Sequence, residues 1–147
     1  MATGQTLLSI GAFVLLSIIA VNINRTHVQA VHNMVENQAR TDALIVGRDL
    51  CDRIQRHSYN PAFDFNQLEA EFGNLDNVND PGRRWSFTSP SGYTLHATFD
   101  ISNERTLALG QTGRLVTVAV FLEEEGEIIP KATYVTAVLP IHESVNP

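Results

Sequence analysis

Two hydrophobic patterns follow one another in the first part of the chain. From about Leu7 to Ile23 nearly every residue is apolar and none is charged, and no proline occurs before Pro61. A run of this length is near the lower limit for crossing a bilayer, which takes ~17–25 residues. Because the run is apolar all round, a helix here needs apolar surroundings on every face. The pattern predicts a helix that spans a membrane or packs between molecules.

From Val28 onward the apolar residues recur at helical spacing instead. They form one stripe, which consists of Val28, Val31, Val35, Ala39, Ala43, Val46, Leu50 and Ile54. The mean interval is about 3.7 residues, close to the ~3.6 of an α-helix. Gly47 costs up to ~1 kcal/mol relative to alanine, which is too little to end a helix. Pro61 does end it, because proline disfavours helical backbone at the residue before it. We therefore predict an amphipathic stem helix over residues 25–60, directly after the apolar segment of residues 1–24.

Residues 61–147 carry the signals of a small globular head. Phe65–Phe72 predicts a short helix with Leu68 and Phe72 facing inward, and residues 73–84 predict a loop. The predicted strands are Trp85–Thr88, Tyr93–Ile101, Leu115–Leu122 and Ala132–Leu139, with turns at residues 89–92 and 123–127 and with Pro130 and Pro140 bracketing the last strand. Residues 103–113 are either a loop or an extra edge strand.

The strand patterns differ in which faces they predict to be buried. Between Tyr93 and Ile101 the apolar residues alternate with Thr94, His96, Thr98 and Asp100, which predicts a strand with one face in solvent. Leu115–Leu122 is apolar on both faces, as is typical of a central strand. All strands follow one long helix. The sequence therefore predicts an α+β fold, in which a long N-terminal helix packs on a small antiparallel sheet of three or four strands.

The charges are divided unequally between these regions. Residues 1–60 carry five Arg and four acidic residues, whereas residues 61–147 carry five Arg or Lys and twelve acidic residues. An acidic head is a poor surface for nucleic acid or for an anionic membrane. Cys51 is the only cysteine, so an intramolecular disulfide is excluded, and we expect it to pack as a small apolar residue.

Candidate chemistry in the head is sparse. The oxygen-rich stretch from Asn74 to Asp80 makes Asp76 and Asp80 weak candidates for calcium ligands, although a solvated turn is favoured because the spacing is not that of an EF-hand. The histidines lack metal-ligand spacing and are expected on the surface; they are His27, His32, His57, His96 and His142. Residues 123–127 are expected to be a solvated turn. Because no nucleophile motif or phosphate loop occurs, we expect no catalytic residues, no cofactor, no resident metal and no small-molecule substrate.

The start of the chain resembles that of type IV pilins, the family that includes type II secretion pseudopilins and minor pilins. The family's processing signal is a glycine followed by a pattern such as Phe-Thr-Leu-Ile-Glu, and the matching residues here are Gly4, Gln5, Thr6, Leu7, Leu8, Ser9 and Ile10. Thr6 and Leu7 match, and Leu8 and Ile10 are similar in character. Gln5 replaces the usual Phe, Ser9 replaces the usual Glu, and residues 1–4 carry no basic residue.

The resemblance implies both a processing step and a mode of assembly. A family member would be cleaved between Gly4 and Gln5, and would pack into a filament through the apolar helix. The residues expected at that contact are Thr6, Leu7, Leu8, Ser9, Ile10, Phe13 and Leu16. The implied partners are copies of this chain or related subunits and a membrane. The implied location is the inner membrane, with one span and the head outside the cytoplasm.

The residues leave a second interpretation open. Arg25 and Arg40 follow the apolar run, and the tendency of positive residues to stay inside would keep that side in the cytoplasm. The alternative is a single-pass envelope protein whose head binds a partner or a larger membrane complex without forming a filament. A soluble enzyme with an unusual hydrophobic start is a third and less favoured class.

Overall fold

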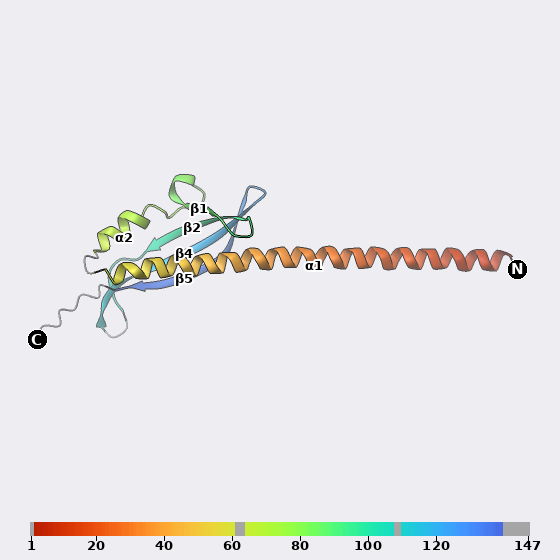
Figure 1. The fold of residues 1–147 in the computed structure, drawn as a ribbon, viewed down its shortest axis with the longest axis horizontal. Helices are drawn as coiled ribbons and strands as arrows, with labels where there is room; N and C mark the ends of the chain where they lie inside the picture. The colour runs from red at the N-terminus through yellow and green to blue at the C-terminus, as the bar shows by residue number, and fades with distance from the viewer. Residues whose placement is uncertain (1, 61–63, 108–109, 140–147) are drawn as a thin grey trace, which may run out of the picture. The chain divides into compact units, whose positions relative to one another are not determined.

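The structure, a computed structural model, describes residues 2–60, 64–107 and 110–139. It contains two units, one extending to Asn37 and the other beginning at Gln38. The helix α1 (Ala2–Ser58) is continuous over 57 residues and is coloured from red to yellow in Figure 1. It ends with Arg56 and His57 in its last turn, where positive charge favours a helix terminus. The predicted apolar helix and stem helix are therefore one uninterrupted element.

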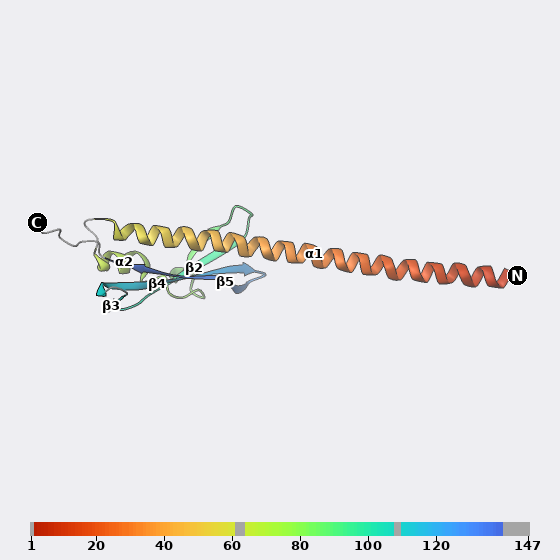
Figure 2. The same ribbon diagram turned by 90° about the horizontal axis from the view of Figure 1, so that it is seen from below.

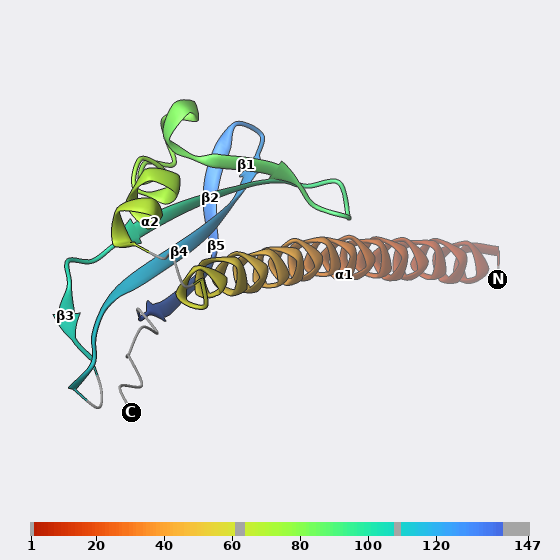
Figure 3. The same cartoon turned by 60° about the vertical axis from the view of Figure 1, so that its left-hand side comes forward.

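The sheet has five antiparallel strands. They are β1 (Trp85–Thr88), β2 (Thr94–Ile101), β3 (Arg105–Thr106), β4 (Thr112–Glu124) and β5 (Glu127–Val138). The main order is β1-β2-β4-β5, and β3 adds a short pairing at the beginning of β4. Figure 3 shows β1, β2 and β4 side by side. The predicted α+β fold is confirmed, and β3 is the extra edge strand that residues 103–113 left open.

The turn between β4 and β5 follows directly from its residues. Glu125 and Gly126 both adopt positive φ, at 53° and 82°. Two such residues form the tight turn that matches the twist of antiparallel strands, and glycine accepts this conformation without a steric penalty. The predicted turn over residues 123–127 is confirmed, although β4 and β5 extend into its ends.

Pro130 was predicted to precede the last strand, and this is wrong. It lies inside β5, paired with Phe121, beside an irregularity in the pairing between Val120 and Phe121. Proline cannot donate a ladder hydrogen bond, so sheets accept it on edge strands and at bulges. β5 offers both conditions. Pro140 lies outside the described residues.

The core lies between the sheet and the helices of the second unit. The short helix α2 (Phe65–Phe72) begins at Asp64, whose carboxylate accepts a hydrogen bond from the Asn66 N–H at 3.2 Å. Its Leu68 and Phe72 are buried, as predicted, and the Phe72 ring centroid lies 4.8 Å from that of Phe99. Figure 2 shows the yellow end of α1 in one layer and β4 and β5 in another. One face of the sheet is thus covered by α1 and α2.

The stripe on α1 is buried over only part of its length. Ala39, Ala43 and Ile54 are buried, and Val46 and Leu50 are partly buried against the core. Cys51 is also buried, as expected of a small apolar residue. The stripe residues before Ala39 are exposed; they are Val28, Val31 and Val35. The predicted packing of the sheet on this stripe therefore holds from Ala39 onward.

Gly47 lies at a close approach between α1 and the sheet. A Cβ at this position would lie 2.6 Å from Cδ2 and Cε2 of Tyr134 in β5, which is far inside van der Waals contact. The Tyr134 hydroxyl donates a hydrogen bond to the Leu44 carbonyl at 3.0 Å. The glycine that costs helix propensity therefore makes room for the ring that attaches β5 to α1.

Candidate membrane and assembly surface

The first unit of the chain presents apolar side chains to solvent on every side. Each residue from Thr3 to Gln38 is exposed, and Leu7 and Phe13 have 72% and 73% of their surface accessible. The other large exposed apolar residues before Arg25 are Leu8, Ile10, Val14, Leu15, Leu16, Ile18, Ile19, Val21 and Ile23. Among the described residues, α1 is the one helix long and apolar enough to cross a membrane by length and composition. This exposed helix is compatible with a membrane anchor, and its side chains need partners from outside the unit.

Hydroxyl groups in the apolar segment bond to the helix itself. The Oγ of Ser9 donates to the Gln5 carbonyl at 3.0 Å, and the Oγ of Ser17 donates to the Phe13 carbonyl at 2.8 Å. An unpaired polar group in hydrocarbon costs several kcal/mol, so this bonding lets both serines face lipid or an apolar neighbour. Thr26 makes the same kind of bond to the Asn22 carbonyl at 2.9 Å.

The predicted assembly residues occupy consecutive turns near the start of α1. Thr6, Leu7, Leu8, Ser9, Ile10, Phe13 and Leu16 all lie in this exposed stretch, after the proposed processing residues Gly4 and Gln5. Ser9 stands where the resembled family has a glutamate, and its hydroxyl is already bonded within the helix. This surface can therefore pack against apolar neighbours, but Ser9 adds no charge to the contact.

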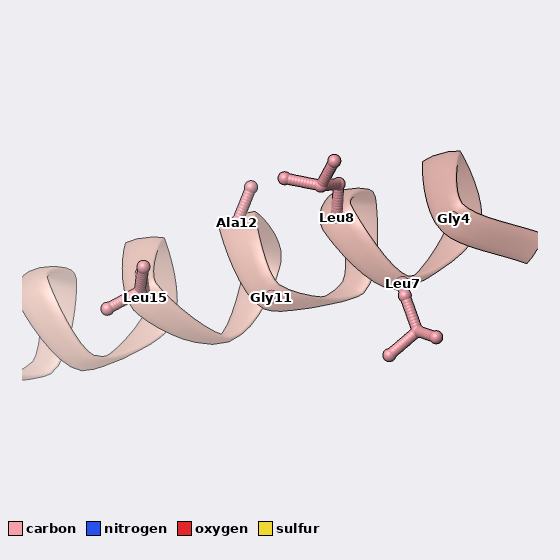
Figure 4. A pocket seen from close by; sticks show the side chains of 6 residues that line it. All are labelled: Gly4, Leu7, Leu8, Gly11, Ala12 and Leu15. Carbon is pink, nitrogen blue, oxygen red and sulfur yellow. The ribbon is translucent and has the colours of Figure 1, made fainter.

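A shallow hollow on α1 extends this surface, and sequence reasoning missed it. It is lined by Gly4, Leu7, Leu8, Gly11, Ala12 and Leu15, as Figure 4 shows. No atom lies within 4 Å of the Cβ positions of Gly4 and Gly11. The two glycines are seven residues apart and thus share a face of the helix. The hollow lets a neighbouring side chain approach the backbone.

The weak calcium candidates in the head have partners within the chain. Arg83 donates to both oxygens of Asp76, from Nε at 2.8 Å and from Nη2 at 2.6 Å. Asp80 accepts the Gly82 N–H at 2.9 Å and caps the 3-10 helix η1 (Pro81–Arg83), which lies in the segment predicted as a loop. The part of the chain that the structure describes holds no group of three or more His, Cys, Asp and Glu side chains suited to a metal ion. These two carboxylates thus organise their own loop.

His96 was predicted on the surface, and this is wrong. It is 1% exposed, and its Nε2–H donates to Oε2 of Glu123 at 2.6 Å. Its Nδ1 is hydrogen-bonded to the Ser86 hydroxyl over 2.9 Å. Arg84 lies 3.7 Å from the same oxygen of Glu123. The solvated-turn expectation is therefore also wrong for Glu123.

The His96 network joins neighbouring strands. Serine, imidazole and carboxylate in this order resemble the chain of groups that activates a nucleophile in hydrolases. Here Ser86 lies directly opposite His96 in the pairing of β1 with β2, and Glu123 belongs to the adjacent β4. The bonds therefore fasten three strands together on the sheet face away from α1. The same face buries Thr98, so the expected solvent face of β2 is covered in its middle, whereas Thr94 and Asp100 remain exposed.

Comparison with protein-family models, curated proteins and solved structures finds no match to this chain. The fold and its exposed helix define the class: an α+β protein with a long N-terminal helix that is long and apolar enough to serve as a membrane anchor.

Proposed function

We propose that the chain is a non-enzymatic structural subunit of a filament of the type IV pilus or type II secretion kind. The observation that carries the proposal is the complete exposure of apolar side chains around α1 from Leu7 to Ile23. One small head cannot cover this surface, and it suits two environments equally well: lipid before assembly and the helices of neighbouring subunits afterwards. The partners are copies of this chain or related subunits.

To move from lipid into contact with other helices, the helix must expose no polar group that lacks a hydrogen bond. The internal bonds of Ser9 and Ser17 meet this requirement. The hollow at Gly4 and Gly11 adds a place where an adjacent helix can approach closely. Identical subunits that contact one another through different surfaces form an open series when the rotation between them does not close a ring, and an open series is the geometry of a filament. In this proposal the chain is made in the inner membrane with its head outside the cytoplasm.

Mass spectrometry of the mature chain tests the processing step. A chain beginning at Gln5, above all with a methylated amino group, is the expected result. Gly4→Leu should abolish this cleavage, and Gly11→Leu, a matched change later in α1, should leave it intact. An intact Met1 in membrane-derived protein would contradict the processed version of the proposal.

Sheared surface fractions test assembly itself. We expect the chain to sediment as filaments from cells, and Leu16→Arg to remain in the membrane or be degraded, because a charge in an apolar contact is unfavourable. Leu16→Ile is the control, since it keeps the apolar surface. Failure of the parent chain to form any high-mass assembly would rule out the filament.

Ser9 and Arg25 favour a second candidate, the single-pass envelope protein without a filament. Ser9 supplies no charge to an assembly contact, and Arg25 follows the apolar run, where a positive residue favours the cytoplasmic side. Protease treatment of spheroplasts separates the orientations. Digestion of the head supports the outside location that the filament requires, whereas protection until the membrane is lysed would place the head in the cytoplasm, contradict the filament and favour the anchored protein.

A further inference from the structure

The sheet has two long sides that no described strand occupies. β1 pairs only with β2, and β5 pairs only with β4, among the residues that the structure describes. Each of these strands therefore leaves one row of backbone N–H and C=O groups without a strand partner. Such a row can pair with a strand of another chain.

The β5 edge lacks the features that usually block such pairing. Its last seven residues, Ala132–Val138, contain no charge, and they are rich in β-branched residues. Natural edge strands are commonly protected by lysine, proline or a bulge. Here Pro130 and Lys131 protect only the beginning of the strand. Val135, in the middle of the uncharged stretch, is 61% exposed and is the one large apolar side chain exposed on the described strands.

The β1 edge has side chains that suit pairing with the β5 edge. Its four residues carry no charge, and Trp85 and Phe87 are half-buried on the face toward the helices, while Ser86 and Thr88 are exposed on the opposite face. Thr133 and Val135 of β5 lie on that same opposite face, because their neighbours across β4 share it with His96. If Thr88 of one copy lies opposite Thr133 or Val135 of the next, the helix-facing sides of the two sheets therefore form one continuous face, and so do the opposite sides.

The directions of the strands decide which edges can meet. Two strands, β2 and β4, lie between β1 and β5, and each of the three pairings is antiparallel, so β1 and β5 run in opposite directions. Two copies in the same orientation thus bring β5 of one beside β1 of the next in antiparallel pairing. Antiparallel pairing of β5 with its own copy needs a two-fold axis normal to the sheet, which also reverses the part of α1 packed on that sheet. The proposed filament excludes that reversal, because its subunits follow one another in the same orientation.

We propose that the β5 edge of one copy pairs antiparallel with the β1 edge of the next copy. The heads then join in an open series, in which α1 points the same way in every copy. This contact rests on the proposed function, since the common orientation of subunits in the filament is what excludes antiparallel pairing of β5 with itself. The occupant of each edge is a second copy of this chain.

Disulfide trapping in the full-length chain tests the contact. All variants carry Cys51→Ala, which removes the native thiol. Thr88→Cys is co-expressed with Val135→Cys or with Thr133→Cys, each with a different tag. Residues opposed across an antiparallel pair lie about 4.5–5.5 Å apart at Cα, within the ~4.4–6.8 Å that a disulfide spans. We expect a dimer with both tags in the mixture and its loss when either variant is expressed alone.

The controls separate this contact from other assemblies. Thr112→Cys, an exposed position in β4 away from β1, should yield no dimer with Val135→Cys. A dimer of Val135→Cys alone would show pairing of β5 with itself and would overturn the proposal. Leu16→Cys reports on contact between the apolar helices. Dimers through Leu16→Cys without any between β1 and β5 would overturn the edge contact and leave the filament standing, and absence of both would overturn both proposals.

Discussion

The apolar stripe on α1 continues through both units, but it is exposed in the first unit and buried in the second. In the first unit Val28, Val31 and Val35 are 60%, 49% and 43% exposed. In the second unit Ala39 and Ala43 are buried under the sheet. The helix is continuous across the boundary, so helix formation itself does not distinguish the parts. What distinguishes them is the sheet, which covers the stripe only in the second unit.

This difference shows what each part needs in order to be stable. The second unit encloses a core, which includes Ile54 of α1, Phe72, Phe99 and the inward row of β4. The exposed part of α1 has no such cover, and an apolar surface of this extent marks a contact with a membrane or with other chains. Changes that act on one part and spare the other therefore test the division.

The largest expected effect is loss of the head's core at Phe72. Phe72→Ala should lower the free energy of unfolding of the head by about 3–5 kcal/mol, because it removes a fully buried ring from contact with Phe99 and Trp85. Chemical denaturation in detergent measures this. Tyr59→Ala, at an exposed position, should change it by less than about 0.5 kcal/mol. Equal effects of the two substitutions would contradict the described core.

A charge in the exposed helix should have a comparable effect on the other part. Leu15→Arg should disfavour membrane insertion by about 2.5–3.5 kcal/mol, since the position is central in the apolar run. Carbonate extraction of membranes measures the shift of protein to the soluble fraction. The denaturation midpoint of the head should not move. A head destabilised by Leu15→Arg would show that the two parts depend on one another.

The same substitution in both parts offers the sharpest comparison. Gly47→Ala should destabilise the head by roughly 1–3 kcal/mol through overpacking against Tyr134, despite a gain of up to ~1 kcal/mol in helix propensity. Gly11→Ala, which meets open space, should leave head stability unchanged. Tyr134→Ala combined with Gly47→Ala should show a favourable coupling energy in a double-mutant cycle. Simple additivity would mean that the ring and the glycine do not meet.

A smaller, pH-dependent effect is expected at Asp42, which lies outside the apolar segment. Burial raises the pKa of this carboxyl, but hydrogen bonds from Ser89, Ser91 and Gln38 outweigh it, so the pKa is lowered from its ordinary 3.8. Because the folded state holds the lower pKa, the stabilisation is complete well above pH 3.8. It is lost as the pH falls below that value through the pKa of the folded state.

Thermal unfolding across this pH range measures the Asp42 effect. Asp42→Asn should lower the head's melting temperature at neutral pH and flatten its decline in acid. Asp49→Asn is a matched change at an exposed position of α1 and should keep the parent pH dependence. A parent-like acid slope in Asp42→Asn would contradict the role of this carboxylate.

Local sequence patterns predicted most of the secondary structure. The stripe on α1, the inward Leu68 and Phe72 of α2, the central β4 and the turn at Glu125 and Gly126 all follow from spacing between near neighbours in the chain. Such spacing determines which side chains share a face, because helices and strands have fixed periods. The exposed apolar helix was recognisable for the same reason.

The errors concern residues whose surroundings come from distant strands. His96 has the polar alternation of a solvent face, but Ser86 and Glu123 from neighbouring strands close over it. Pro130 was predicted as a boundary because its place on an edge strand beside a bulge depends on the sheet order. From the sequence, Gly47 was notable only for its small cost in helix propensity. Its contact with the Tyr134 ring is visible only in the folded structure.

The sequence by itself determined a long helix with an apolar first part, a stripe on its second part, and the strands of a small sheet, because these features depend on periodicity over a few residues. Only the tertiary structure shows where the stripe becomes covered and which polar groups are buried. It also shows that, among the described strands, β1 and β5 lie at the edges of the sheet and run in opposite directions. Those properties depend on which strands lie next to one another. Contacts between residues far apart in the chain produce no periodic pattern in the local sequence, so the sequence alone does not predict them.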